Sequence, residues 1–341
     1  MAPAPDKLTP DDSRVEHHTV QIRGNNWHYL LAKPDGAPSA TIVLVHGWPD
    51  LAFGWRYQVP YLLSLNLRVI VPDMLGYGQT DAPDAVEEYS MKKIAGDIRD
   101  LAAHVVGPEE KIILGGHDWG GAVVWKTAMW YPEIVHAVIS VCTPYFAPRE
   151  AWIAPEDLVK MLPNFKYQLH LAGPEVEAKI VGEEKLRQFL SALYGARGPN
   201  KEAAFTTAQG VVFENLDKLG QSPLLTPEEV DFYVKEYARK GMHGPLNWYR
   251  TARVNWEEEL PLLKEGPERV RIKAPSLMIT ASKDAALPPA MTAKMGDLVE
   301  KLSRGEVDTT HWALWEAPSE VNKYIGDFLA GVFGGEQASR L

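Results

Sequence analysis

The spacing of hydrophobic residues along this chain indicates short buried strands separated by helices. Residues 15–31 alternate between polar and apolar positions around Gly24-Asn25, which predicts two strands joined by a turn. Further runs are almost continuously apolar, as in strands buried on both faces of a sheet: 41–45, 69–73, 111–114, 135–141, 276–280 and the shorter, more polar 304–307. Helical patterns over 89–106 and 120–130 lie between them. This alternation predicts an α/β fold with a mostly parallel central sheet flanked by helices.

The alternation stops between about residues 143 and 250. This stretch has no good strand pattern and contains four helical patterns, over 155–171, 182–195, 201–213 and 226–240. We therefore predict a helical cap over residues 144–250, inserted between the strand that ends near Val141 and the helix that follows Arg250. Residues 1–143 and 251–341 would form the core, and the cap would shape a pocket at the carboxyl ends of its strands.

An acidic residue occupies the sharp turn between the 111–114 strand and the 120–130 helix. Residues 116–120 have the sequence GHDWG, in which small residues flank a central Asp118 and let the backbone pass. This is the pattern of the nucleophile elbow of the α/β-hydrolase fold, with a carboxylate in place of the usual serine. A carboxylate can displace an alkyl leaving group or open a strained ring, forming an ester that water must then cleave.

The order nucleophile, acid, histidine of that fold predicts the partners of Asp118. Asp284 follows the 276–280 strand and would orient the base, and His311 follows the 304–307 strand and would activate water. Asp308 is the rival orienting acid, but it is too close to His311 in sequence to reach the right side of the imidazole easily.

The oxyanion that forms when water attacks the ester requires backbone N–H donors. The elbow geometry predicts those of Trp119, which follows the nucleophile, and of Trp48, in the HGWP loop of residues 46–49. His46 in this loop is interpreted as a buried histidine that satisfies the loop backbone. Five aromatic residues are expected to bind substrate, with core packing as the competing explanation for each: Trp48, Trp119, Trp312, Tyr145 and Phe146.

Composition and charge argue against some classes of binding partner. Hydrophobic residues make up 45% and charged residues 23% of its 341 residues, which is ordinary for a globular protein. A formal net charge of −10 without a basic patch argues against nucleic acid or an anionic membrane as a partner. The ten histidines are scattered without paired spacing, so no metal site is expected.

The cysteine content and the termini bear on location. A single cysteine, Cys142, excludes an internal disulfide and favours a reducing compartment, and its apolar surroundings indicate a buried structural thiol. With no signal peptide and no membrane-spanning run, we expect a cytoplasmic protein. Ser339-Arg340-Leu341 is a variant of the Ser-Lys-Leu address, which predicts peroxisomal import if the source is eukaryotic and the signal is used.

Taken together, these elements resemble the soluble epoxide hydrolases of the α/β-hydrolase fold. The resemblance rests on HGWP (46–49), GHDWG (116–120), Lys283-Asp284, His311-Trp312 and above all GPLNWYR (244–250), and it extends from about residue 15 to 330. It implies the hydrolase domain without the N-terminal phosphatase-like domain of some animal members. The expected substrate is a small apolar epoxide that reacts with water, without a metal or an organic cofactor, in a monomer or homodimer.

The resemblance also implies two cap tyrosines that donate hydrogen bonds to the epoxide oxygen. Tyr249 matches one through the Asn-Trp-Tyr-Arg motif, and Tyr167 matches the other through a shorter motif. Phenols, with an ordinary pKa of about 10, are neutral at physiological pH and can donate to an oxygen on which negative charge develops. The competing explanation is that both rings simply pack within a helical cap.

Several alternatives stay open at this point. A haloalkane or haloacid dehalogenase shares the fold, the Asp nucleophile and the order of the triad, but a halide needs no proton from a phenol. A biosynthetic enzyme could open one particular epoxide with an internal hydroxyl group. A binding protein without turnover would have no need of the nucleophile, acid, base and both tyrosines together.

Overall fold

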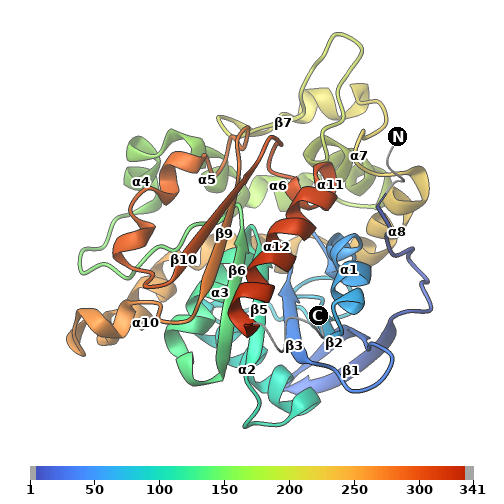
Figure 1. Ribbon diagram of the computed structural model, residues 1–341. Helices are drawn as coiled ribbons and strands as arrows, with labels where there is room; N and C mark the ends of the chain where they lie inside the picture. Colours follow the sequence, from blue (N-terminus) through green and yellow to red (C-terminus); the bar gives the residue numbers. More distant parts are fainter. Residues whose placement is uncertain (1–4, 335–341) are drawn as a thin grey trace. The chain divides into compact units, whose positions relative to one another are not determined.

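A computed structural model describes residues 5–334 of the chain (Figure 1). These residues divide into two compact units, the first of residues 5–74, 91–148 and 259–334 and the second of residues 75–90 and 149–258. The C-terminal tripeptide on which the peroxisomal expectation depends lies outside the described residues. None of the helices in residues 5–334 has both the length and the apolar composition needed to cross a bilayer.

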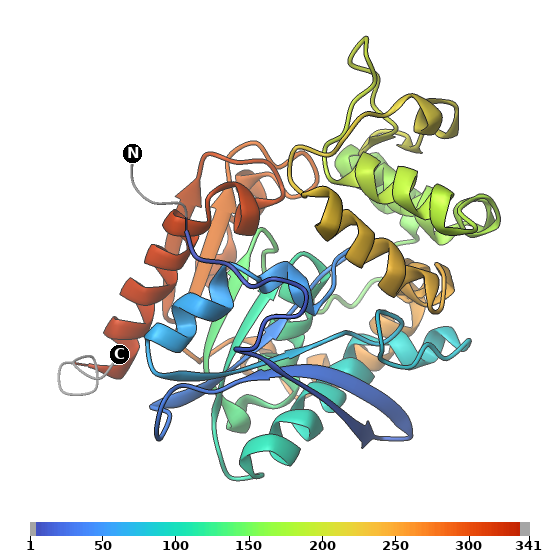
Figure 2. The same ribbon diagram turned by 90° about the vertical axis from the view of Figure 1, so that its right-hand side faces the viewer.

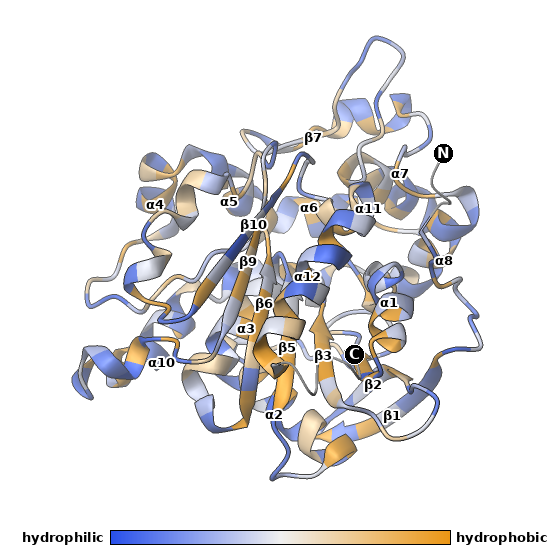
Figure 3. Ribbon diagram, viewed as in Figure 1, coloured by the Kyte–Doolittle hydropathy of each residue, from blue (hydrophilic) through white to orange (hydrophobic). Residues whose placement is uncertain are grey.

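An eight-stranded sheet forms the centre of the first unit, in the order β1-β2-β4-β3-β5-β6-β9-β10. β1 pairs antiparallel with β2 and β2 with β4, whereas all other neighbours are parallel. The strands are β1 (Glu16–Ile22), β2 (Asn25–Ala32), β3 (Ala40–Val45), β4 (Leu67–Pro72), β5 (Ile112–His117), β6 (Val135–Val141), β9 (Ser276–Ala281) and β10 (Leu302–Val307). Figure 3 shows hydrophobic colouring along β3, β5 and β6, in line with their central positions. The predicted mostly parallel sheet is confirmed.

The turn between β1 and β2 lies one residue earlier than the sequence suggested. Ile22 pairs with Asn25, so the two turn residues are Arg23 and Gly24. Both have positive φ, 49° and 98°, which suits the two-residue turns that match the twist of a hairpin. Glycine adopts this conformation at no steric cost, and Arg23 tolerates it at an exposed position.

Helices cover both faces of this sheet (Figure 2). α1 and α12 pack on one face, and α2 and α3 pack on the other. The helices of the first unit are η1 (Ala52–Trp55), α1 (Gln58–Ser64), α2 (Met91–Val106), α3 (Trp119–Trp130), η3 (Pro132–Ile134), η7 (Pro267–Val270), η8 (Pro289–Thr292), η9 (Met295–Asp297), α11 (Ala313–Glu316) and α12 (Pro318–Phe333). The arrangement leaves the carboxyl ends of the parallel strands to loops, where ligands bind in such folds.

The second unit is mainly helical. Its elements are η2 (Val86–Tyr89), α4 (Pro155–Met161), η4 (Pro163–Phe165), α5 (Lys166–Ala172), α6 (Pro174–Lys179), α7 (Glu183–Leu193), β7 (Phe205–Thr206), β8 (Gly210–Val211), η5 (Phe213–Lys218), α8 (Pro227–Ala238), α9 (His243–Asn247) and η6 (Trp248–Arg250). α10 (Ala252–Lys264) begins in the second unit and ends in the first. In chain order all elements from α4 to η6 fall between β6 and α10, and none of them joins the eight-stranded sheet.

Two of the four helical patterns expected in this stretch were wrong or incomplete. Residues 201–213 contain the small β7–β8 hairpin instead of a helix, because Gly210 has a positive φ of 77° and β-branched residues flank it. Residues 155–171 form three separate pieces, since Pro163 disfavours helical geometry at Leu162, whose φ and ψ are −126° and 78°. The helices expected over 182–195 and 226–240 are present as α7 and α8.

Candidate active site

Asp118 lies at the tight turn between β5 and α3. Its φ of 54° and ψ of −124° fall in a region that residues other than glycine rarely occupy, at a typical cost of about 1–3 kcal/mol. The turn closes only because its flanking residues are glycines. A Cβ added to Gly116 would lie 2.2 Å from the carbonyl oxygen of Gly120, and one on Gly120 would lie 2.0 Å from that of Val45. The side chain of Asp118 is therefore raised above the strand ends by a backbone that no larger residues could form.

Asp118 is buried, and both its carboxylate and its backbone carbonyl accept hydrogen bonds. Only 7% of the residue is exposed, and its Oδ1 accepts a 2.7 Å hydrogen bond from the backbone N–H of Trp48. Gly47 permits this approach, because a Cβ there would lie 2.4 Å from the Asp118 Cβ. The Thr143 hydroxyl donates to the Asp118 carbonyl at 2.6 Å and supports the backbone of the turn. The sequence carried no signal for Thr143, which lies just beyond the end of β6.

His311 lies between the carboxylates of Asp284 and Asp118. Its Nδ1 is 2.7 Å from Asp284 Oδ2, and its Nε2 is 3.4 Å from Asp118 Oδ2. The other oxygen of Asp284 accepts from the backbone N–H groups of Ala286 and Leu287 at 2.8 and 2.9 Å. When Nδ1–H donates to Asp284, Nε2 is the ring nitrogen that faces Asp118 and can take up a proton there. The structure thus brings the three predicted residues together.

The electrostatics of this group favour a charged pair. Burial alone would lower the pKa of His311, but the charge of Asp284 and the contacts with Asp118 and Asp284 outweigh it and raise that pKa well above its ordinary value. For Asp284, burial alone would raise the pKa, but His311 and the two loop N–H groups hold it well below its usual range. An imidazolium between two carboxylates is therefore the stable state while both acids are ionised.

Asp308, the rival orienting acid, is engaged elsewhere. Its Oδ2 accepts from Lys283 Nζ at 2.8 Å and its Oδ1 accepts from the Ser282 hydroxyl at 2.6 Å. Its side chain is exposed, whereas that of Asp284 is completely buried. The geometry therefore favours Asp284 as the partner of His311.

His117 and Cys142 support the backbone of His311 from below. The Nε2–H of His117 donates to the carbonyl oxygen of His311 at 2.8 Å, and the thiol of Cys142 lies 3.5 Å from the same oxygen. Burial lowers the pKa of His117 to about 4, so its ring is neutral at physiological pH. Burial raises the pKa of the Cys142 thiol to about 12, so it stays protonated.

The same three residues are the part of this site that could in principle hold a metal ion. The ligating atoms of His117, Cys142 and His311 lie within 4.8 Å of one another. The donor set fits a metal poorly, however, because a protein thiol binds metal as a thiolate and the pKa of Cys142 is strongly raised. His117 Nε2 is also committed to a backbone carbonyl. These atoms are better explained as supports for His311.

The loop of residues 46–49 is shaped by His46. The Nδ1–H of His46 donates to the Gly47 carbonyl at 2.9 Å, and its Nε2 accepts from the backbone N–H of Met74 at 2.9 Å. Burial lowers the pKa of His46 to about 4, which keeps the imidazole neutral and able to do both. The interpretation of His46 as a buried residue that satisfies the loop backbone is confirmed.

The aromatic residues expected to bind substrate have different surroundings. Trp48 is buried beside Asp118, Trp119 begins α3 directly after it, and Trp312 is buried with its ring stacked on Trp315 at 4.6 Å. Tyr145 donates its hydroxyl to the Val270 carbonyl at 2.5 Å and has the contacts of a core residue. Phe146 is 45% exposed. These contacts do not support the prediction that Tyr145 and Phe146 bind substrate.

Tyr167 and Tyr249 lie next to each other in the second unit. Tyr167 is in α5 and Tyr249 is in η6, and their ring centroids are 6.1 Å apart with the rings nearly perpendicular, at 75°. Both residues are buried. Phe205, in β7, adds a further edge-to-face contact with Tyr167 at 5.6 Å. Two residues separated by 81 positions in the sequence therefore form one aromatic pair in the fold.

Comparisons with known proteins agree with this geometry. The alpha/beta hydrolase fold family matches residues 40–172. An epoxide hydrolase of Neurospora crassa, srdG, is 44% identical over 338 residues, which cover 96% of this chain and 98% of that protein. The bifunctional epoxide hydrolase 2 of Mus musculus is 33% identical and is covered over 57% of its length. The solved structure of epoxide hydrolase A from Mycobacterium thermoresistibile is 29% identical and covers 93% of this chain and 98% of its own, with a TM-score of 0.77.

The sheet order, the elbow at Asp118 and the match to residues 40–172 define an α/β hydrolase whose nucleophile position is an aspartate. The Neurospora relative matches this sequence over almost its whole length. The chain belongs to the epoxide hydrolase family of the α/β-hydrolase fold.

Proposed function

We propose that this protein hydrolyses epoxides to vicinal diols through a covalent ester on Asp118. The observation that supports the proposal is that the two oxygens of this carboxylate have different partners. Oδ1 is bound by the Trp48 N–H at 2.7 Å, whereas Oδ2 lies beside His311 Nε2 at 3.4 Å. Oδ2, which has no backbone donor as close as that of Oδ1 among the described residues, is thus the attacking oxygen, and Oδ1 becomes the ester carbonyl oxygen beside the Trp48 N–H.

In the first step Oδ2 of Asp118 attacks an epoxide carbon and the C–O bond of the ring breaks. The alkoxide that leaves takes a proton from a phenol, for which the candidates are Tyr167 and Tyr249 on the predicted cap of residues 144–250. Their support is the Asn-Trp-Tyr-Arg motif and the pairing of their rings at 6.1 Å. A strained ring with a poor leaving group benefits from such proton donation by typically 10²–10⁴-fold.

In the second step water attacks the carbonyl carbon of the ester. His311 takes a proton from this water, Asp284 stabilises the imidazolium, and negative charge develops on Oδ1. The N–H of Trp48 is in place for that charge, and the N–H of Trp119 is its expected partner. In the collapse of the intermediate the ester C–O bond breaks, and the departing alkoxide takes the remaining proton of the attacking water. This releases the diol and restores the carboxylate of Asp118, whose new oxygen comes from water. The phenolate left by ring opening regains a proton through solvent from the one that His311 releases on alkylation, and His311 ends the cycle as the imidazolium.

The electrostatics suggest how His311 becomes a base only when it is needed. While Asp118 is ionised, two carboxylates favour the protonated imidazole and raise its pKa. Ester formation neutralises Asp118 and leaves Asp284 as the one remaining acid beside the ring. The pKa of His311 therefore falls on alkylation, so that a neutral base is available for the attack of water.

The intact mass of His311→Gln after separate exposure to a small aryl epoxide and to a haloalkane tests the proposal. Without the base, the ester on Asp118 should accumulate. A mass gain equal to the whole epoxide, absent with the haloalkane, is the expected result. A gain equal to the alkyl group without halide would instead identify a dehalogenase. No adduct with either compound, or diol formation retained in Asp118→Ala, would overturn the covalent route.

A further inference from the structure

Arg250 connects the two elements that carry Tyr167 and Tyr249. It directly follows Tyr249 at the end of η6, and its guanidinium reaches the carboxyl end of α5, the helix that carries Tyr167. Its Nε donates to the Ala172 carbonyl at 3.1 Å, and its Nη2 donates to the Gly173 carbonyl at 3.4 Å. The last carbonyls of a helix lack partners within the helix and carry partial negative charge, so a cation that bonds to them stabilises the helix end.

Glu177 anchors the guanidinium on the opposite side. Its Oε2 accepts from Arg250 Nη2 at 2.8 Å, and its Oε1 lies 2.8 Å from His243 Nδ1. His243 Nε2 lies 3.2 Å from the Asp84 carbonyl, so both ring nitrogens face acceptors. Two acceptors are both satisfied only by the imidazolium, and the pKa of His243 is accordingly raised: Glu177 and the Asp84 carbonyl outweigh the opposing effect of burial.

The third nitrogen of the Arg250 guanidinium, Nη1, bonds to a residue of the same GPLNWYR motif (244–250). Nη1 donates at 2.9 Å to Asn247 Oδ1, and the Asn247 amide donates at 3.3 Å to the Asp84 carbonyl. A single planar side chain therefore bonds α5, α6 and α9 together immediately beside Tyr249. Its three nitrogens donate hydrogen bonds to four acceptors, which a point charge such as a lysine ammonium cannot reproduce.

We propose that Arg250, anchored by Glu177, is a positioning residue that holds the Tyr167 and Tyr249 hydroxyls at a common point for proton donation in ring opening. This inference rests on the function proposed above. Each phenol is carried by a short element, α5 with seven residues and η6 with three. Short helices of this kind have little stability of their own, so contacts between them decide where their side chains lie. Arg250 touches no reacting atom and acts only through the tyrosines.

The expected effect follows from the sensitivity of catalysis to geometry. A displacement of about 1 Å in a catalytic group can cost on the order of 100-fold in rate. Arg250→Met should therefore slow ring opening by about 10- to 100-fold. Arg250→Lys keeps the positive charge but lacks the planar guanidinium with its several donors. Its ring-opening rate should therefore be almost as low as that of Arg250→Met. Glu177→Gln keeps Arg250 and the shape of its anchor and should cost about 3- to 10-fold, since a neutral partner holds a guanidinium less firmly.

Single-turnover experiments separate the two chemical steps. After mixing with a small aryl epoxide and rapid quenching, the rise of the Asp118 ester in intact-mass spectra reports ring opening, and its decay reports hydrolysis. Arg250→Met should slow the rise and leave the decay within about twofold. Arg187→Met is the matched control, because Arg187 also forms an ion pair in the second unit, with Asp231 at 2.6 Å, but far along the chain from the tyrosine motif.

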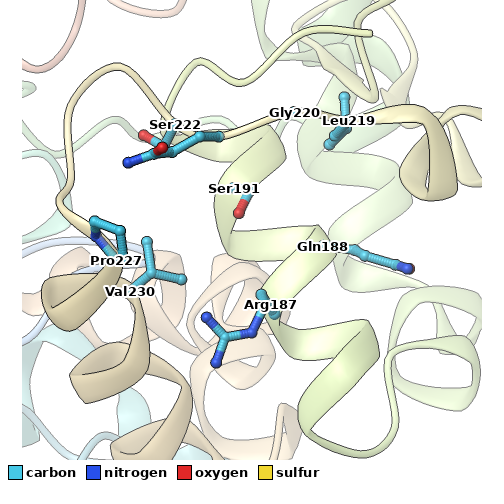
Figure 4. A pocket seen from close by; sticks show the side chains of 9 residues that line it. Arg187, Gln188, Ser191, Leu219, Gly220, Ser222, Pro227 and Val230 are labelled. Atoms are coloured by element: carbon cyan, nitrogen blue, oxygen red, sulfur yellow. The ribbon is translucent and has the colours of Figure 1, made fainter.

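Figure 4 shows the surroundings of this control residue. Arg187 lies at a pocket of about 280 Å³ between α7, the loop of residues 219–222 and the start of α8. Arg187→Met removes the same type of side chain from the same unit, and both steps should proceed unchanged.

A double-mutant cycle with the tyrosines completes the test. If Arg250 acts through the phenols, Arg250→Met should cost at least threefold less in the Tyr167→Phe or Tyr249→Phe background than in the parent. An equal loss in parent and phenylalanine backgrounds, equal slowing of both steps, or a similar loss in Arg187→Met would overturn the positioning role. If Arg250→Met does not fold, Glu177→Gln takes its place in the cycle. If the parent forms no ester at all, the proposed function fails, and this inference fails with it.

Discussion

At the scale of single residues, the site combines a strained nucleophile with a charged pair behind it. Asp118 has a positive φ, and Oδ1 of its carboxylate accepts a hydrogen bond from the Trp48 N–H. His311 is held by Asp284 through a 2.7 Å contact; the Asp284 side chain is completely buried and His311 is half-buried. In such surroundings the loss of one hydrogen-bonding partner changes both the orientation and the pKa of the other.

Asp284→Asn should separate the two steps of the reaction. Asparagine keeps the shape but removes the charge that raises the pKa of His311, and it can hold the wrong tautomer of the ring. We expect ester hydrolysis to fall by about two to four orders of magnitude, with ring opening within about tenfold of the parent. The measurement is the decay of the ester by intact mass. Undiminished decay would remove Asp284 from the role of orienting acid.

The rate of ester hydrolysis should change with pH in a predictable direction. Hydrolysis requires neutral His311 and is lost as pH falls through the pKa of that residue in the ester. Because the charge of Asp284 raises this pKa, Asp284→Asn should move the acid limb of the profile to lower pH. A limb that stays in place would show that another group controls it.

Tyr249→Phe should slow ring opening by one or two orders of magnitude, because the alkoxide loses one proton donor while the Tyr167 hydroxyl remains. The pre-steady-state rise of the ester measures this rate. Hydrolysis of the ester should be almost unaffected, because the phenols have no part in the second step. An unchanged rise would exclude Tyr249 from proton donation.

At the scale of elements, the central sheet was easier to predict than the helices of the second unit. Most of the parallel strands are nearly continuous apolar runs, so their positions follow from composition, and the eight strands of the central sheet overlap the predicted ranges. β10 is the more polar exception. Apart from α7 and α8, the second unit consists mainly of short pieces whose conformation depends on contacts with distant residues. Residues 201–213 formed a hairpin instead of a helix because the positive φ of Gly210 and local packing outweigh helical periodicity.

The elbow between β5 and α3 gives a stability prediction. In Gly120→Ala the new Cβ would lie 2.0 Å from the Val45 carbonyl oxygen, so β3 or α3 must shift. We expect a loss of at least about 2 kcal/mol in the free energy of unfolding, measured by urea denaturation. Gly331→Ala in α12 is the matched control: nothing lies within 4 Å of its Cβ, and alanine should stabilise the helix by about 0.5–1 kcal/mol. Equal effects of the two substitutions would contradict the steric account of the elbow.

At the scale of the whole molecule, two buried neutral histidines link stability to pH. Burial lowers the pKa values of His46 and His117 from 6.5 to about 4. Between these values the unfolded chain binds protons that the folded chain does not. Their contribution to stability is therefore present above pH 6.5 and is lost as pH falls towards 4.

The midpoint of urea unfolding should accordingly decrease as pH falls from 6.5 to 5, below the range in which the raised pKa of His311 acts with the opposite sign. Each pKa unit of difference corresponds to about 1.4 kcal/mol, so the two residues together can account for several kcal/mol over this range. His104→Gln, which changes an exposed histidine at the end of α2, should leave the slope unchanged. A midpoint that is flat over this range would show that His46 and His117 accept protons without unfolding.

The sequence by itself determined the order of the elements and the chemical type of the site. Asp118, Asp284 and His311 were predicted because each follows a recognisable strand, and parallel strands bring their carboxyl ends to one edge of a sheet. Only the tertiary structure decided which groups complete the site. Thr143 and His117 bond to the backbone carbonyls of Asp118 and His311, and a hydrogen bond to a carbonyl requires a position in space that no local pattern records.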